Sequence, residues 1–181
     1  MKLSKIIMND GNIHLRLIEE KDKEEYYQVG FAEADEEVNY YTGTDASFSL
    51  EDIEKYVSRI VSDETRYDFL ICDEMDRILG EVILNEIDEE SRMANLRIGL
   101  FRKQFLEKGV GTLSLQMAIS FAFRTLKLHR VELEVFEYNH RAKHCYEKIG
   151  FIEEGRKRDA LFYKGQYYHV IIMAMLESDY L

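Results

Sequence analysis

The stretch that decides the fold is Leu133-Glu-Val-Phe-Glu-Tyr-Asn-His-Arg-Ala-Lys-His-Cys-Tyr-Glu-Lys-Ile-Gly-Phe151. Its first residues alternate apolar and polar side chains, which is the period of a β-strand with one buried face. From His140 to Ile149 the pattern is that of a short helix, and Gly150 is a typical residue to end it. The stretch therefore predicts a strand followed directly by a helix.

A second local signal is Lys108-Gly-Val-Gly-Thr112, between a predicted strand and an apolar helix expected to run to about Leu128. Glycines let a backbone approach a ligand closely. The amides of residues 110–113 open this helix, and free amides together with the helix dipole bind anions such as a diphosphate. A plain glycine-rich turn has the same sequence, and neither common nucleotide-binding glycine motif is matched. From the residues alone, both interpretations stay open.

Hydrophobic periodicity along the rest of the chain gives the order strand, two helices, three strands, helix, strand, helix, two strands. The first helix is expected to open with a capping box at Asp22–Glu25 and to run to about Gly30, and the second is expected to start at Ser49–Asp52. This order predicts an α+β fold in a single domain over residues 1–181. Its mixed, mostly antiparallel sheet would have about six to seven strands and be flanked by helices on both faces.

The composition favours a cationic partner. Among 181 residues, 24 Lys and Arg stand against 35 Asp and Glu, a net charge of −11. Such a surface repels nucleic-acid phosphates and attracts amines. The longest apolar stretch, Val170–Leu176, is too short to cross a membrane, and no secretion signal is visible at the N-terminus. The two cysteines have no metal-type spacing, so we expect reduced thiols and a cytoplasmic protein.

A family resemblance rests on the run Asn139-x-Arg-Ala-x-x-x-Tyr-x-x-x-Gly-Phe151, on the glycine loop and on Ile98-Gly-Leu-Phe101. Together they resemble the GNAT superfamily of N-acetyltransferases. The chain looks most like the subgroup that contains ribosomal-protein N-terminal acetyltransferases and spermidine acetyltransferases, and the resemblance covers nearly the whole chain. It implies acetyl-CoA as the acyl donor and direct attack by an amine in a ternary complex.

The resemblance also implies where the cofactor binds. The diphosphate would rest on the glycine loop, the pantetheine arm would pair with a strand edge and an Asn side chain, and the thioester sulfur would lie near Tyr146. The implied cofactor-binding residues are Ile98, Leu100, Lys108, Gly109, Val110, Gly111, Thr112, Leu113 and Asn139.

The sequence departs from the family at Leu106 and Glu107. An Arg or Gln that the family usually has there is missing, and Glu107 adds a negative charge near the phosphate site. Either Lys108 or the upstream pair Arg102 and Lys103 is expected to offset that charge. The departure also leaves an alternative open, in which the fold senses CoA or binds a partner without turnover.

The reaction needs a base and an acid. An alkyl amine is protonated at neutral pH and must lose a proton before it attacks a thioester. We expect Glu134 to accept this proton, because alternation places it on the sheet face opposite Leu133, and we expect Tyr146 to protonate the leaving thiolate. Glu86 is the second candidate for the base, and Glu33 lies in an acidic run that resembles the cation-binding region of polyamine acetyltransferases.

Two further expectations concern ligands and partners. His140 and His144 share a helix face, but no third ligand has a matching spacing, so no metal is expected. The acceptor is expected to be a peptide N-terminus, a polyamine or another cationic small molecule, without a nucleic-acid or membrane partner. Dimers are common in the family, and a homodimer is implied by the resemblance alone.

Overall fold

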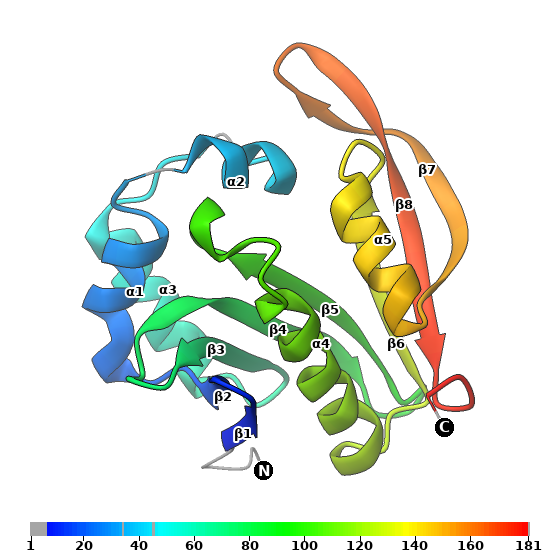
Figure 1. Ribbon diagram of the computed structural model, residues 1–181, viewed down its shortest axis with the longest axis horizontal. Helices are drawn as coiled ribbons and strands as arrows, with labels where there is room; N and C mark the ends of the chain where they lie inside the picture. Colours follow the sequence, from blue (N-terminus) through cyan, green and yellow to red (C-terminus); the bar gives the residue numbers. More distant parts are fainter. Residues whose placement is uncertain (1–6, 34, 45, 181) are drawn as a thin grey trace.

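A computed structural model describes residues 7–33, 35–44 and 46–180 of the chain. Its strands form one mixed sheet in the order β1-β2-β3-β4-β5-β6-β8-β7 (Figure 1). All neighbours pair antiparallel except β5 and β6, which are parallel. The strands are β1 Ile7–Asp10, β2 Ile13–Leu17, β3 Tyr67–Asp73, β4 Ile78–Asp88, β5 Met93–Leu100, β6 Arg130–Phe136, β7 Ile152–Tyr163 and β8 Gln166–Leu176.

The α+β class, the element order and the mixed sheet are confirmed, and the strand count is higher than predicted. The sheet has eight strands, because β1 adds an edge strand that pairs with β2. The two strands are joined by a tight turn at Gly11, whose φ is +60°. Residues 1–6, the start of the segment that showed no secretion signal, lie outside the described part of the chain.

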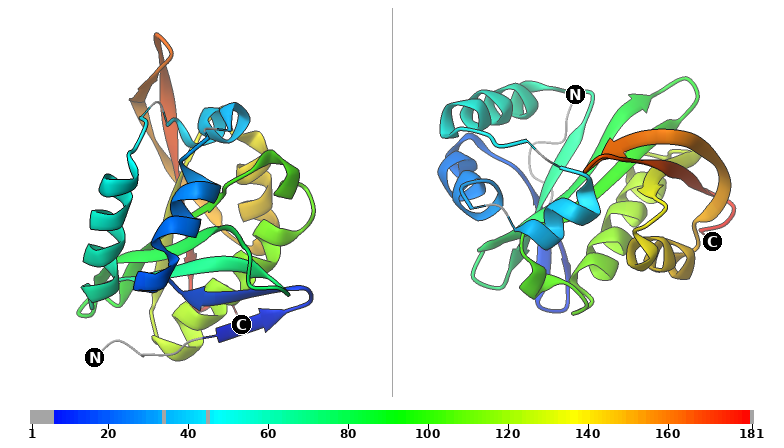
Figure 2. Two further views of the ribbon diagram at one scale, coloured as in Figure 1. Left: turned by 90° about the vertical axis from the view of Figure 1, so that its left-hand side faces the viewer. Right: turned by 90° about the horizontal axis from the view of Figure 1, so that it is seen from above.

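Helices cover both faces of the sheet (Figure 2). The α-helices are α1 Lys23–Gly30, α2 Glu36–Thr42, α3 Leu50–Ser62, α4 Val110–Ser120 and α5 His140–Ile149. Short 3-10 turns precede α1 (η1, Glu20–Asp22) and follow β5 (η2, Lys103–Phe105). Within the described residues, no helix is long and apolar enough to span a bilayer.

Each face of the sheet has its own core. On one face, α4 packs against the strands through its own side chains Leu115 and Ile119. Tyr146 of α5 belongs to the same hydrophobic cluster. On the other face α1 and α3 cover Leu70, Cys72 and Ile78, with Val57 of α3 fully buried. The sheet is therefore the middle layer between two sets of helices. An opening within this layer requires two neighbouring strands to separate.

The apolar helix after the glycine loop differs from its prediction. The α-helix ends at Ser120 and continues as one π-helical turn over Phe121–Thr125 (η3), rather than to about Leu128. In this turn the amide of Leu126 donates to the carbonyl of Phe121 at 3.0 Å. Phe121, Ala122 and Phe123 of this turn are all buried.

Both predicted helix starts are confirmed, but the predicted capping box at Asp22–Glu25 is wrong. Helix α3 starts after Ser49, as expected, and Ser49 forms a capping box with Asp52. Asp22 opens no capping box with Glu25; it is itself the partner of Glu19 at the start of η1. Its carboxylate is taken by Arg16, whose Nη1 and Nη2 lie 2.8 and 3.0 Å from the two Asp22 oxygens.

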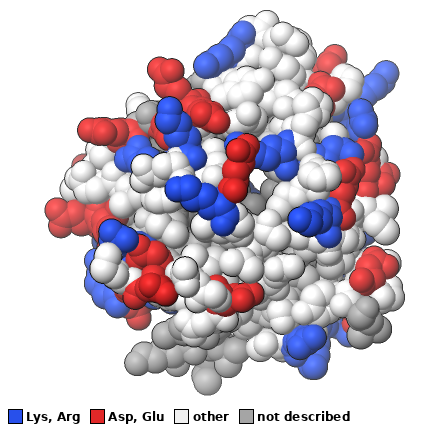
Figure 3. All heavy atoms as spheres, in the orientation of Figure 1, with Lys and Arg blue, Asp and Glu red and all other residues white. Residues whose placement is uncertain are grey.

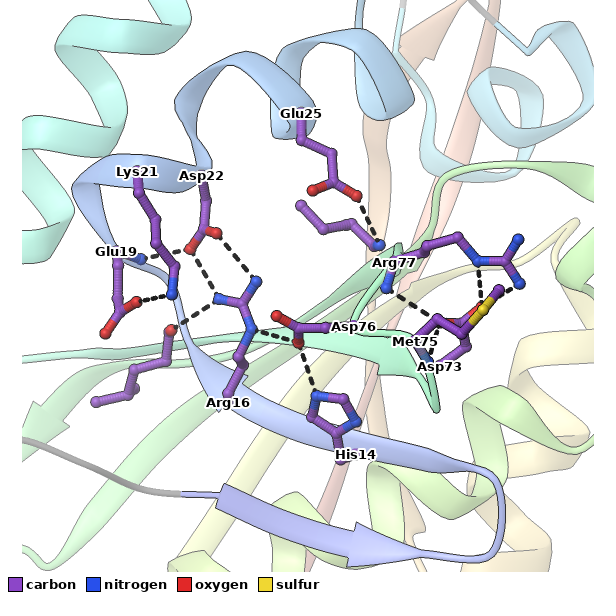
Figure 4. A network of polar contacts seen from close by, with 12 residues as sticks. His14, Arg16, Glu19, Lys21, Asp22, Glu25, Asp73, Met75, Asp76 and Arg77 are labelled. Atoms are coloured by element: carbon purple, nitrogen blue, oxygen red, sulfur yellow. Dashed lines mark hydrogen bonds and ion pairs between the residues drawn. The ribbon is translucent and has the colours of Figure 1, made fainter.

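The Arg16 guanidinium joins β2 to two other segments (Figure 4). Besides Asp22, its Nε donates to Asp76 Oδ1 at 2.7 Å, and His14 Nε2 lies 2.8 Å from the same oxygen. Partial burial opposes ionisation of Asp76, but hydrogen bonds from Arg16 and His14 outweigh it and lower the Asp76 pKa. His14, Cys72 and Asp76 could approach one metal ion, yet the adjacent guanidinium already neutralises Asp76.

Loss of the Arg16–Asp22 pair is expected to destabilise the protein strongly. Asp22→Asn would leave a buried guanidinium without its main counter-ion, so we expect the free energy of unfolding to fall by about 3 kcal/mol. Urea unfolding measures this change. The control Glu51→Gln breaks a solvent-exposed pair with Lys55 and should have little effect. A loss for Asp22→Asn no larger than that of the control would contradict the assignment.

Candidate active site

A cleft opens where β5 and β6 separate. Their parallel pairing is limited to Met93–Asn95 against Arg130–Glu132. Beyond this point the strands diverge and enclose a cavity of about 670 Å³, lined by both strands and by α2, α4 and α5. Figure 3 shows a hollow near the middle of this face of the molecule, with acidic and basic side chains around it.

The N-terminus of α4 faces this cleft. Gly109 has a left-handed conformation, with φ of +79°, and its position offers no side-chain cap to the helix. Among the described residues, no partner accepts from the amides of Val110, Gly111 and Thr112. Leu113 is different, because its amide donates to the Gly109 carbonyl at 3.0 Å. The expectation of four free amides is therefore corrected to three.

The space in front of the loop is open. A Cβ added at Gly109 would meet nothing within 4 Å, and one added at Gly111 would only touch Leu100 at 3.9 Å. Gly109, Gly111 and Thr112 line the cleft, whereas Lys108, Val110 and Leu113 are not among the lining residues. Three amides and a helix dipole facing an open space form an anion site.

The edge of β5 forms one wall of the cleft. Ile98 and Leu100 line it, and β5 pairs with β4 on its other side through Leu100. Since the ladder with β6 stops at Asn95, the β5 backbone beyond it presents an edge without a neighbouring strand. A linear ligand with amide groups can add to such an edge as an extra strand.

Helix α5 forms the opposite wall with Asn139, Cys145 and Tyr146. Asn139 caps α5, with Oδ1 accepting from Ala142 N at 3.1 Å and Nδ2 donating to the Tyr41 carbonyl at 3.3 Å. One Nδ2 hydrogen stays available for a ligand. Tyr146 is 8% exposed, and burial, with a smaller contribution from Cys145, raises the pKa of its phenol. The phenol is therefore a proton donor at neutral pH.

The other end of the cleft carries several glutamates, and the basic residues Arg97 and Lys157 also line the cleft. In β6, Leu133 and Val135 are buried in the α4 core, and Glu134 projects from the opposite face, as alternation predicted. Glu86, Glu132 and Glu134 line the cleft, and Glu134 pairs with Lys157 of β7. Glu86 has a φ of +51° and lies where the β4–β5 register shifts.

Glu33 does not reach the cleft. It follows α1 and is absent from the residues that line the cavity; its carbonyl accepts from Arg102. Arg102 also donates to the Gln28 carbonyl at 3.3 Å, so the loop after α1 holds this side chain. Glu33 therefore lies outside the cleft in which we expected it to contact the substrate, and Arg102 contacts the loop after α1 rather than Glu107.

The basic group beside Glu107 is Arg141, which the sequence analysis missed. Its Nη1 lies 3.7 Å from a Glu107 oxygen and 4.0 Å from a Glu37 oxygen. Its guanidinium also stacks over the Tyr41 ring, 4.4 Å from the centroid. Arg141, Glu107 and Tyr41 all line the cleft. The position in the motif, two residues after Asn139, was the signal that could have found it.

The sequence matches the model of a known protein family. Residues 12–152 match the model of the acetyltransferase (GNAT) domain. The chain belongs to this family. It is an N-acetyltransferase that moves an acetyl group from acetyl-CoA to a primary amine.

The relatives agree with this assignment. The spermidine N(1)-acetyltransferase of Vibrio cholerae is 31% identical over 74% of this chain and 76% of its own length. A putative ribosomal N-acetyltransferase of Bacillus subtilis is 29% identical over 63% of this chain and 58% of its own length. The crystal structure of the Vibrio cholerae spermidine N-acetyltransferase with CoA and spermine superposes with a TM-score of 0.84, at 26% identity, over 94% of this chain and 99% of that one.

Removal of the Glu107 charge is expected to strengthen cofactor binding. In Glu107→Gln, Arg141 loses a competing carboxylate and can turn to the diphosphate, so the Kd for acetyl-CoA should fall about three-fold. Arg141→Gln should raise the Kd about ten-fold, since hydrogen bonds to charged groups contribute ~1.5 kcal/mol. Isothermal calorimetry measures both, with Glu51→Gln as a remote control. Weaker binding by Glu107→Gln would refute the assigned role of Arg141.

Proposed function

We propose that the acceptor is a polyamine and that the chain is a polyamine N-acetyltransferase. The observation that carries this proposal is the acidic end of the cleft, where Glu86, Glu132 and Glu134 line one cavity with Tyr146. Several carboxylates spread over one surface suit a flexible molecule with several ammonium groups better than a single amine. The similarity to spermidine acetyltransferases supports the same acceptor class.

Binding of acetyl-CoA is proposed for the residues that face the anion end of the cleft. The amides of Val110, Gly111 and Thr112 would hold the diphosphate. Gly109 has no side chain, so the diphosphate could come close to these amides. The β5 edge at Ile98 and Leu100 and the free Asn139 amide hydrogen would hold the pantetheine arm. When bound, the cofactor supplies a thioester whose carbonyl carbon the amine attacks.

The two proton transfers are assigned to Glu134 and Tyr146. Glu134 accepts the proton that the ammonium group must lose before its nitrogen can attack. Tyr146 donates a proton to the sulfur when the carbon–sulfur bond breaks, and its burial keeps this proton on the phenol. Because the amine attacks directly, no side chain of the protein forms a covalent bond with the acetyl group.

The CoA-sensor alternative is not favoured. It rested on Leu106 and Glu107, and Arg141 lies beside Glu107 in the cleft. We further propose that residues 1–181 act as one catalytic domain in the cytoplasm, as a homodimer, without a metal, nucleic acid or membrane partner. The excess of 11 negative charges supports the preference for cationic over nucleic-acid partners.

An acceptor screen tests the proposed substrate class. With acetyl-CoA fixed, we expect kcat/KM for spermidine and spermine to exceed that for butylamine by at least about ten-fold, because one further ammonium–carboxylate contact contributes ~1.4 kcal/mol. Thiol release measures turnover. A peptide with a free N-terminus is the second arm, and a preference for it over spermidine would overturn the polyamine assignment.

Substitution of Tyr146 and Glu134 tests the proton transfers. Tyr146→Phe should lower kcat about 100-fold with unchanged CoA affinity, the scale of lost general-acid assistance. Because the phenol pKa is raised, wild-type activity should show no loss from Tyr146 ionisation up to about pH 10.

Glu134→Gln should flatten the rise of the rate with pH, since deprotonation of the amine then lacks its base. Glu132→Gln removes a neighbouring carboxylate on the same strand face and is the matched control. This variant should keep the rise of the rate with pH. If the rate of Glu134→Gln rises with pH as in wild type, Glu134 is excluded as the base and Glu86 is the next residue to test.

A further inference from the structure

An amine of the protein itself lies at the acidic end of the cleft. The Lys157 side chain lines the same cavity as Tyr146, and its Nζ contacts Glu134 Oε1. In the sheet, Lys157 is opposite Val170 of β8, and Glu134 is opposite Ile172 of the same strand. The lysine on β7 therefore reaches across β8 to the glutamate on β6.

Three carboxylates act on this ammonium. The hydrogen bond to Glu134 is the main cause of a raised Lys157 pKa, followed by the charges of Glu134, Glu132 and Glu86. These are the same three glutamates that line the proposed acceptor end. Of the three, only Glu134 contacts Nζ, and Glu132 pairs with Arg130 at 2.6 Å, so the Glu134 carboxylate is the group that holds the ammonium.

The contact is one that a ligand can replace. The Lys157 side chain is 52% exposed and that of Glu134 is 43% exposed, so neither is locked in the core. Pairing of β7 with β8 stops at Lys157 and resumes at Leu161. A lysine side chain has four rotatable bonds, so it can move away from Glu134 without a change of the backbone.

We propose that the Lys157 ammonium competes with the acceptor for the Glu134 carboxylate, and so sets acceptor affinity and specificity. This inference rests on the proposed function of the same cleft. An acceptor must displace Lys157 from Glu134 before its own nitrogen can reach the base. An acceptor with several ammonium groups contacts more than one carboxylate at once and displaces the lysine more easily than a monoamine does.

The test compares Lys157→Met with wild type in two measurements. For spermidine, we expect KM to fall about three- to five-fold, the range that loss of a partly exposed ion pair allows, with kcat changed less than two-fold. Calorimetric titration of spermine into the CoA-saturated protein should show a matching decrease in Kd. Butylamine should gain more than spermidine, because it is the weaker competitor.

Two variants serve as controls. Lys55→Met removes a lysine that is paired with Glu51 on α3, so it changes the net charge equally and should leave KM and Kd as in wild type. Lys157→Arg keeps the positive charge and should also stay near wild type. An unchanged acetyl-CoA affinity in Lys157→Met shows that the variant is folded.

Unchanged or weaker spermine binding by Lys157→Met would overturn the proposal, because the lysine would then be neutral or helpful to the acceptor. The failure of the broader function has a different signature. If wild type acetylates neither polyamine nor any other amine, the polyamine assignment fails, whereas the binding measurement still decides the role of Lys157.

Discussion

The separation of β5 from β6 is the constraint on which the rest of the structure depends. The two strands share a ladder of only three residue pairs, at the end where each strand begins. Beyond it β5 keeps β4, and β6 keeps β8, so each strand retains one full set of hydrogen bonds. The two facing edges do not pair with each other, so their backbone groups can pair with a ligand in the cleft. A linear, amide-containing cofactor supplies such partners.

The cleft has ends of opposite electrostatic character. At the α4 end, three backbone amides and the helix dipole favour a diphosphate, and Arg141 stands beside Glu107. At the other end, Glu86, Glu132 and Glu134 line the cleft, and the Lys157 ammonium contacts Glu134. Tyr146 lines the same cavity from α5. This polarity suits the proposed arrangement of an anionic donor and a cationic acceptor in one cavity, although the protein as a whole carries a charge of −11.

Features set by neighbouring residues could be predicted from the sequence. Alternation along 131–136 placed Glu134 on the correct face, and the glycine loop placed an amide-lined helix start at the cleft. Features that depend on distant residues could not be predicted. Lys157 meets Glu134 because the strand order is β6–β8–β7. The Asp22 side chain binds Arg16 and does not form the capping box with Glu25 that the local sequence indicates. The π-helical turn after Ser120 reflects core packing, which periodicity alone does not encode.

The central claim is that the free amides at the start of α4 and the open edge of β5 bind acetyl-CoA. Titration of ¹⁵N-labelled protein with acetyl-CoA, followed by amide-resolved NMR, tests it most directly. We expect the largest shifts at the amides of Val110, Gly111 and Thr112, with further shifts along Ile98–Leu100. Saturable binding with the largest shifts in another part of the protein, and none at these amides, would contradict it.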